Sequence, residues 1–329
     1  MTEKRTIRWL IAHQPEELFL RTANAFANEL KKLGEHSLEV DILTYPDYAA
    51  KYGEIPDLSG MKLNPDDEES FEKGLSRFWQ ALSNSEIEMS QMQVVRVADL
   101  CTDFYALDLP YLFDDHDHAT RVLDGEIGKE LCHKLAENSG VRGLAFTYSG
   151  GYRVIGSVKP LQTLQDVVDS HIAVQNHLSL AKTLEDMGGQ YSMTSPNLWH
   201  KHDPLGPNED CDAVETTYLR FEHTRGKHVL RTNHSMFLTT IVVSNKFWDS
   251  LTEDQRKNFT IAAERAAKIE RQWSIEDAEK YEKNTEKYGI TIRDLPESDK
   301  EELRRRSQIA YHKSKYLFTP GLVKRIRTS

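Results

Sequence analysis

Histidine and acidic side chains gather at two places in this sequence, and both have the composition of a metal site. The first is the stretch 114–118, Asp-Asp-His-Asp-His, and the second runs from His200 and His202 to Asp212. Imidazole and carboxylate groups are usual ligands of Zn²⁺, which can activate a bound water for hydrolysis. The first stretch is also typical of a helix start, where acids accept hydrogen bonds from free backbone N–H groups. We therefore predict no metal ion, and keep a metal-dependent hydrolase that uses His200, His202 and Asp212 as an alternative.

Arg153 occupies a position where a ligand is expected in many α/β proteins. It follows Gly150, Gly151 and Tyr152 just after a predicted buried strand, residues 141–148. Ligands bind beyond the carboxyl ends of such strands, and a guanidinium there can hold a carboxylate by two parallel hydrogen bonds. The same pattern fits a structural ion pair. We predict that Arg153 is the main charged anchor for an anionic ligand, and that its replacement by alanine barely changes the stability of the unliganded protein.

The sequence lacks the short motifs of the common enzyme classes. The dinucleotide-binding, phosphate-loop, nucleophile-elbow and zinc-protease motifs are all absent, so nucleotide binding and the usual hydrolase sites gain no support. The three cysteines, Cys101, Cys132 and Cys211, have the spacing of neither a disulfide framework nor a zinc site. No cofactor is predicted, and the protein is not expected to be an enzyme.

Charge and length exclude further classes. Among 329 residues, 42 Lys and Arg stand against 52 Asp and Glu, a net charge of −10, whereas a protein that binds nucleic acid needs a basic surplus. The longest apolar stretch, residues 236–243, is far shorter than the ~20 residues that cross a bilayer. The first residues carry no apolar signal segment, so we expect either a cytosolic protein or one whose signal has been removed. A chain of this length usually forms two domains.

Strands and helices alternate through most of the sequence. Apolar or alternating segments predict strands at 8–12, 38–42, 87–95, 141–148, 170–174, 236–243 and 290–292. Amphipathic segments predict helices at 17–33, 64–82, 116–137 and 178–187. Residues 189–212 contain three prolines and few aliphatic side chains, which indicates a long loop. The alternation predicts an α/β fold with a parallel sheet covered by helices on both faces.

One helical segment is far longer than the others. Thr252 and Gln255 form a capping box, and no proline interrupts the residues from Glu253 to Tyr288, after which Gly289 ends the pattern. Such a helix would be ~50 Å long at 1.5 Å per residue, longer than a small domain is wide. We predict one helix, straight or kinked, that contacts two domains.

Seven stretches of the sequence, taken together, resemble one protein family. They occur in the family's order and spacing, and they are residues 109–113 (LPYLF), 123–131 (LDGEIGKEL), 149–153 (SGGYR), 159–166 (KPLQTLQD), 212–215 (DAVE), 232–234 (TNH) and 245–255 (NKFWDSLTEDQ). The chain is similar to the extracytoplasmic solute-binding proteins of TRAP (tripartite ATP-independent periplasmic) transporters, the DctP-like family. No single stretch is decisive, and their joint order carries the resemblance.

The resemblance implies a two-lobe fold of the periplasmic-binding-protein type with a long helix spanning both lobes. Lobe I would comprise residues 1–150 and about 238–278, and lobe II residues 151–237 and about 279–329. The protein would be a periplasmic monomer that captures a small organic solute between its lobes by hinge closure and presents it to the TRAP membrane subunits. Binding of this kind needs no chemistry, since the ligand contacts both lobes only in the closed state. A solute sensor that works without a transporter is a further alternative.

The resemblance also assigns ligand-facing positions, and the sequence departs from the family at two of them. Arg153 corresponds to the first of two ligand-facing arginines, whereas Ala173 replaces the second. Glu215 ends an Asp-Ala-Val-Glu segment in which the family has glycine at the second place. Because an alanine would leave space in the cleft, we expect an organic acid with a ring or a longer apolar body rather than a short-chain acid.

Alignment with the family places further polar and aromatic side chains in the cleft. They follow predicted strands or lie in the long loop, and they are His13, Gln93, Gln175, Trp199 and His234. The expected cleft is therefore rich in neutral donors and imidazole groups.

Overall fold

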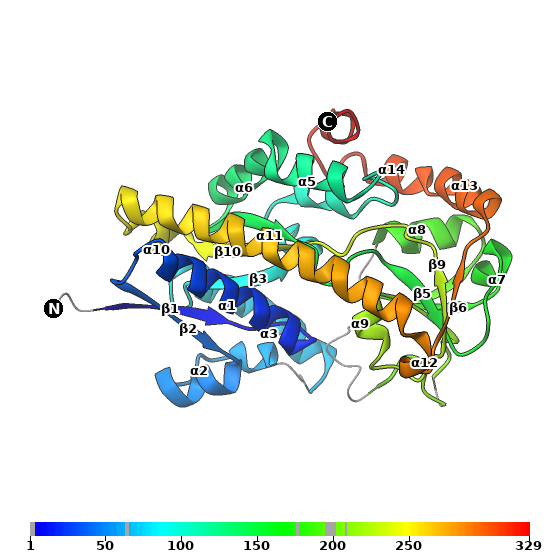
Figure 1. Cartoon of the computed structure of the whole chain (residues 1–329), viewed down its shortest axis with the longest axis horizontal. Helices are drawn as coiled ribbons and strands as arrows, with labels where there is room; N and C mark the ends of the chain where they lie inside the picture. Colours follow the sequence, from blue (N-terminus) through cyan, green and yellow to red (C-terminus); the bar gives the residue numbers. More distant parts are fainter. Residues whose placement is uncertain (1–3, 63–65, 176–177, 195–201, 208) are drawn as a thin grey trace. The chain divides into compact units, whose positions relative to one another are not determined.

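The computed structural model describes residues 4–329 except 63–65, 176–177, 195–201 and 208. By its internal contacts the chain divides into two compact units. Figure 1 labels helices and strands of the chain. Unit 1 comprises residues 1–101, 119–149 and 239–272, and unit 2 comprises residues 102–118, 150–238 and 273–329. Residues 102–118, which the resemblance would place in lobe I, lie in unit 2.

Unit 1 is built on a five-stranded sheet in the order β2-β1-β3-β10-β4. Its strands are β1 (Arg5–Leu10), β2 (Leu38–Leu43), β3 (Met89–Gln93), β4 (Val141–Thr147) and β10 (Thr239–Ser244). β1 runs parallel to β2 and β3, but β10 runs antiparallel to both β3 and β4. The prediction of a wholly parallel sheet is therefore wrong at β10. The chain enters β10 from unit 2, so no crossover helix within the unit forces this strand to be parallel.

Helices cover the sheet of unit 1 largely as the sequence predicts. They are α1 (Glu16–Lys32), α2 (Tyr45–Tyr52), α3 (Glu68–Ser83), α4 (Val94–Val97), α5 (His116–Asp124), α6 (Glu126–Asn138) and α10 (Asn245–Asp249), with a 3₁₀ turn at Leu58–Met61. The single helix expected at 116–137 is two helices, because Gly125 has extended backbone between them. A Cβ at Gly125 would lie 2.4 Å from the carbonyl oxygen of Arg121, so the sharp junction requires glycine.

Unit 2 contains a six-stranded mixed sheet in the order β11-β9-β5-β8-β6-β7. Its strands are β5 (Val154–Ser157), β6 (His171–Val174), β7 (Gln190–Met193), β8 (Ala213–Thr216), β9 (His228–Arg231) and β11 (Thr291–Asp294). β7 lies within the expected loop 189–212, where a four-residue strand with half-exposed side chains has no hydrophobic alternation to reveal it.

Short helices surround this second sheet. They are α7 (Leu164–Val168), α8 (Leu178–Asp186), α9 (Tyr218–Phe221), α12 (Thr285–Tyr288), α13 (Glu297–Arg306), α14 (Gln308–Ser314) and α15 (Leu322–Arg327), with a 3₁₀ segment at Thr102–Asp108. The two faces of the sheet carry separate apolar clusters. One includes Ile155, Ile172 and Val174, and the other includes Val154 and Ala173, because successive residues of a strand point to opposite faces.

The long helix α11 (Glu253–Lys283) contributes to both units, as predicted. The capping box forms, since the backbone N–H of Thr252 donates to Gln255 Oε1 and the N–H of Gln255 donates to Thr252 Oγ1. Within unit 1 the ring of Phe259 packs 5.3 Å from that of Phe26. Within unit 2 the ring of Tyr281 stacks 6.2 Å from that of Tyr218. The helix breaks at Asn284, whose backbone is not helical, before α12 continues to Tyr288.

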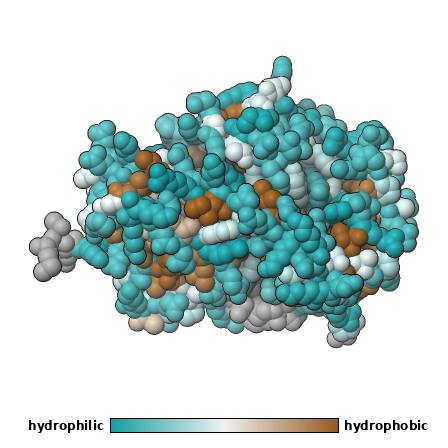
Figure 2. Space-filling model, viewed as in Figure 1, coloured by the Kyte–Doolittle hydropathy of each residue, from teal (hydrophilic) through white to brown (hydrophobic). Residues whose placement is uncertain are grey.

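The surface of the molecule is mainly polar on the face drawn in Figure 2, where apolar side chains form small separate patches. Among the described residues, we find no helix with both the length and the apolar character that a membrane crossing requires.

Replacement of Phe259 by alanine tests the packing of α11 in unit 1. Its ring is fully buried against Phe26 and Phe247, so the variant should lose about 3–5 kcal/mol of unfolding free energy. Guanidinium denaturation followed by circular dichroism measures this loss. Lys257→Ala, an exposed position on the same helix, serves as the control, and equal stability of the two variants would contradict the packing described.

Candidate functional site

A deeply buried ion pair of unit 2 joins Arg153 and Glu215. Arg153 Nη1 donates to Glu215 Oε1 at 2.7 Å, and the two side chains are 2% and 0% exposed. The sheet register explains the pair. β5 and β8 are antiparallel with Ile155 opposite Glu215, and Arg153 lies two residues before Ile155, so its side chain points to the same face as that of Glu215.

Two glycines shape the backbone that leads into Arg153. Gly150 and Gly151 have φ values of 116° and 77°, a conformation that other residues rarely adopt. Their turn lets residues 151–153 pair with residues 235–237. The N–H of Phe237 donates to the carbonyl of Gly151, and that of Arg153 donates to the carbonyl of Ser235, both at 2.9 Å. This pairing brings the ring of Phe237 beside the Arg153 guanidinium.

A second buried arginine, Arg220, lies against the same aromatic ring. The guanidinium carbons of Arg153 and Arg220 are 4.5 Å and 4.1 Å from the Phe237 centroid. Arg220 is 3% exposed. Burial, reinforced by the positive charge of Arg153, lowers the pKa of Arg220 to about 9, against the opposing effect of Glu215. The sequence did not reveal Arg220, because it follows β8 on the one-turn helix α9, where no periodicity marks a buried residue.

Two further residues predicted from the sequence join this cluster. Gln175 is 3% exposed, and its Nε2 donates to the backbone carbonyl of Glu215 at 2.9 Å. His234 is buried, with Nδ1 2.7 Å from Thr232 Oγ1 and Nε2 3.6 Å from Glu215 Oε1. The structure therefore gathers Arg153, Glu215, Gln175 and His234 in unit 2, and Arg220 is added to them. Their contact with a ligand stays a prediction.

The burial of Arg153 in an ion pair changes the stability that we expect for Arg153→Ala. Replacing it with alanine would leave the Glu215 carboxylate without this partner in a fully buried position, and a buried charge that loses its partner is destabilising. Stability of the unliganded protein is therefore expected to fall with Arg153→Ala, rather than barely change.

Ala173 lies in an apolar environment rather than in the polar cluster. It is opposite Val214 in the register of β6 and β8, so its side chain points to the other face from Glu215. There it is fully buried in a cluster that includes Tyr218 and Phe221. Aromatic side chains therefore pack around Ala173. Contact between this residue and the ligand stays a prediction.

Two of the residues predicted to bind ligand, His13 and Gln93, lie in unit 1. His13 is buried after β1, with its ring 5.4 Å from that of Phe19, and Gln93 ends β3 half-buried. A polar group not predicted from the sequence lies on the same strand. Gln91 Nε2 lies within hydrogen-bonding distance, 2.9–3.0 Å, of the hydroxyl oxygens of Thr147, Ser149 and Thr239. Trp199 and His200 lie outside the described residues.

The acidic and histidine cluster at residues 114–118 has a structural role. The N–H of His118 donates to Asp115 Oδ1, and the His118 ring contacts the backbone of Ile326 and Asp114. The interpretation of residues 114–118 as a helix start is therefore confirmed by α5. Within the described ranges, no three His, Cys, Asp or Glu side chains come together as a metal site.

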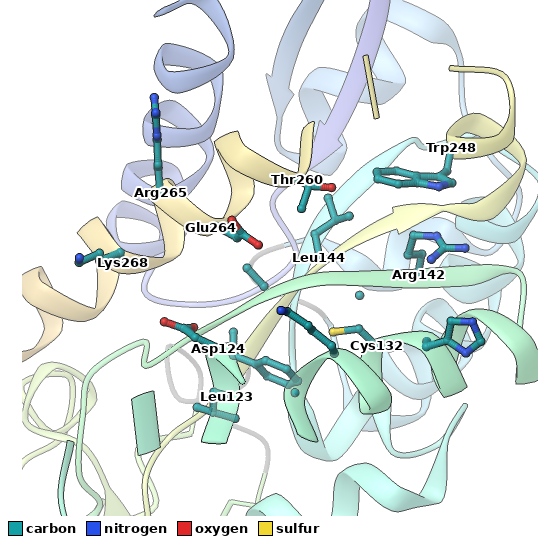
Figure 3. Close-up of a pocket in the computed structure, with 16 residues that line it drawn as sticks. Leu123, Asp124, Cys132, Arg142, Leu144, Trp248, Thr260, Glu264, Arg265 and Lys268 are labelled. Atoms are coloured by element: carbon teal, nitrogen blue, oxygen red, sulfur yellow. The ribbon is translucent and has the colours of Figure 1, made fainter. Parts of the chain in front are cut away.

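A surface hollow of about 530 Å³ lies in unit 1 (Figure 3). The side chains labelled there include Asp124, Cys132, Arg142, Trp248 and Glu264, and the Arg142 guanidinium lies 5.2 Å from the Trp248 ring. None of the residues predicted to bind ligand lines this hollow. It is therefore distinct from the buried cluster of unit 2.

Comparison with known protein families shows to which family the chain belongs. Residues 67–197 and 215–316 match the bacterial extracellular solute-binding proteins, family 7. The chain belongs to this family. Its members are binding proteins rather than enzymes, so the metal-dependent hydrolase gains no support.

Individual relatives are distant in sequence. The chain is 26% identical over 155 residues to the C4-dicarboxylate-binding periplasmic protein DctP of Rhodobacter capsulatus, an alignment that covers 47% of this chain and 46% of that protein. The chain thus matches about half the length of this relative.

Solved structures show that the predicted fold class is right. A TRAP periplasmic solute-binding protein from Ochrobactrum anthropi, with its C-terminus in the ligand-binding pocket, has a TM-score of 0.79 and 19% identity over 100% of this chain and 95% of that one. A second from Xanthobacter autotrophicus, with bound β-D-galacturonate, has a TM-score of 0.77 and 18% identity over 98% and 99% of the two chains. At these identities the likeness establishes the two-lobe α/β fold.

Replacement of Glu215 by alanine tests the buried pair. The Arg153 guanidinium would lose its carboxylate partner at a fully buried site, which should reduce the unfolding free energy by about 3–5 kcal/mol. Denaturant unfolding of the unliganded protein measures the change. Glu279→Ala is the matched control, because Glu279 pairs with Lys283 at the surface and its loss should not change stability measurably. Equal stability of both variants would refute the role of the buried pair.

Proposed function

We propose that this protein is the extracytoplasmic solute-binding component of a TRAP-type transporter and that its ligand is an organic acid. Membership of the family supports the uptake role. The observation that carries the choice of ligand is the pair of buried arginines on Phe237 beside a single buried glutamate. A fixed, desolvated guanidinium binds carboxylates more strongly than a solvated one does.

Arg153 is the proposed anchor for the ligand carboxylate. Its Nη1 already donates to Glu215, and its fork offers further N–H donors on the same planar group. Glu215 accepts hydrogen bonds when ionised, so it suits ligand hydroxyl groups better than a second ligand carboxylate. This combination favours a hydroxylated acid with one carboxylate. The bound galacturonate of the Xanthobacter protein has this chemistry, and it also has the ring expected from the sequence.

Capture by closure of two lobes is part of the proposal. The ligand would lie between the lobes, with His13, Gln93 and Trp199 contributing from the positions assigned by resemblance. Gly150 and Gly151 lie where the chain passes from unit 1 to unit 2, and hinge motions are commonly absorbed at a few such connecting residues. The protein would work in the periplasm as a monomer and deliver its ligand to the membrane subunits of the transporter.

A conservative replacement, Arg153→Lys, tests the anchor. Lysine keeps the charge but loses the planar fork, so affinity for the acid should fall by at least about 30-fold, or about 2 kcal/mol. A thermal-shift screen of uronates, hydroxy acids and C4-dicarboxylates first identifies the best acid, and isothermal titration calorimetry then measures its affinity for each protein.

The control for this experiment is Arg293→Lys, an exposed arginine of unit 2, which should bind as the wild type does. Unchanged affinity in Arg153→Lys would show that Arg153 is not the anchor. A folded wild-type protein that bound no acid of the panel would overturn the proposed ligand class.

A further inference from the structure

Arg220 is a buried arginine that neither the sequence pattern nor the resemblance assigns to the site. Its position depends on the segment after β8. Thr217 precedes the single turn of α9, in which the N–H of Arg220 donates to the Thr217 carbonyl at 3.2 Å. The turn directs the guanidinium to the Phe237 ring, where that of Arg153 also lies. Two cations are thus held on one aromatic side chain, beside the carboxylate of Glu215.

The same helical turn is linked to Ala173. Tyr218 and Phe221, on either side of Arg220 in the chain, belong to the apolar cluster that contains Ala173. A long side chain at position 173 would compete with these aromatic rings for the same buried space. The small side chain of Ala173 therefore leaves room for Tyr218 and Phe221 to pack. The packing of these two rings fixes α9, and α9 in turn positions Arg220.

Two like charges so close together, both almost completely removed from water, repel each other. Glu215 interacts favourably with both, since it bonds Arg153 directly and its charge opposes the lowering of the Arg220 pKa. A second carboxylate brought near Phe237 would stabilise both guanidinium groups further. An uncharged molecule of the same shape would not do so.

We propose that Arg220 is a specificity-determining residue of the ligand site, which supplies with Arg153 the two guanidinium charges that select a carboxylate over its uncharged amide. In this chain Arg220 on α9 provides the second positive charge, while position 173 on β6 is apolar. This inference rests on the proposed function, because it concerns the ligand of the same site.

The test compares an acid with its amide in Arg220→Gln. D-galacturonate and D-galacturonamide are the first probes, and the best acid of the thermal-shift panel with its primary amide replaces them if galacturonate does not bind. Titration calorimetry should show that affinity for the acid falls by about 30-fold or more, whereas affinity for the amide changes by less than about threefold. Arg220→Lys keeps a cation and should retain part of the preference for the acid. Arg293→Gln, at an exposed position, should leave both affinities unchanged.

The outcomes separate this inference from the proposed function. If the wild type binds the acid but Arg220→Gln weakens acid and amide equally, or weakens neither, Arg220 has only a structural role and the inference is wrong. If Arg220→Gln does not fold, the ratio of the two affinities in Arg220→Lys decides, and a ratio equal to that of the wild type would overturn the inference. If the folded wild type binds no acid of the panel, the proposed ligand class itself fails.

Discussion

The Arg153–Glu215 ion pair is the constraint on which the polar cluster of unit 2 depends. Both side chains are almost completely buried, and removing two charges from water costs free energy that only close, well-oriented contacts offset. The antiparallel register of β5 and β8 provides this orientation, because it places the two residues diagonally on one face of the sheet. Gln175 then bonds the Glu215 backbone, and His234 lies close to the Glu215 carboxylate.

Helix α11 holds the segment that leads into this pair. In unit 1 the buried carboxylate of Glu270 accepts hydrogen bonds from the N–H groups of Tyr148 and Ser149 at 2.8 Å and 2.9 Å. In unit 2 the hydroxyl of Ser274 accepts one from the N–H of Gly150 at 3.0 Å. The chain passes between units at the peptide that joins Ser149 to Gly150, and the helix passes between Gln272 and Trp273. Side chains of α11 in each unit therefore hydrogen-bond to the backbone on that unit's side of the junction between Ser149 and Gly150.

Position 173 and the buried arginine of α9 are linked through the packing of unit 2. Ala173 lies on one face of the sheet among aromatic side chains, whereas Arg153 and Glu215 lie on the other. α9 connects the two environments, since its flanking aromatic residues pack around Ala173 and its arginine reaches Phe237. We therefore expect a larger residue at position 173 to shift the arginine on the neighbouring turn. Such coupling is local and needs no change in the order of the strands.

The sequence by itself determined the α/β fold class, the long helix with its capping box, and the family to which the chain belongs. These features depend on local periodicity and on the order of short stretches, which are properties of the linear chain. Arg153 and Glu215 could be proposed as ligand-facing residues because each ends a stretch that resembles the family. The break at Gly125, in contrast, depends on how closely the Arg121 carbonyl approaches it, and the antiparallel β10 depends on a strand that returns from the other unit.

Only the tertiary structure decided that Arg153 is paired with Glu215, that Ala173 points to the opposite face of the sheet, and that Arg220 joins Arg153 on Phe237. These residues are separated by up to 84 positions in the chain, and their contacts follow from strand register and from a one-turn helix. A shift of one residue in register would send each side chain to the other face. Spacing along the sequence cannot specify such a register, because it is set by the packing of all the strands together.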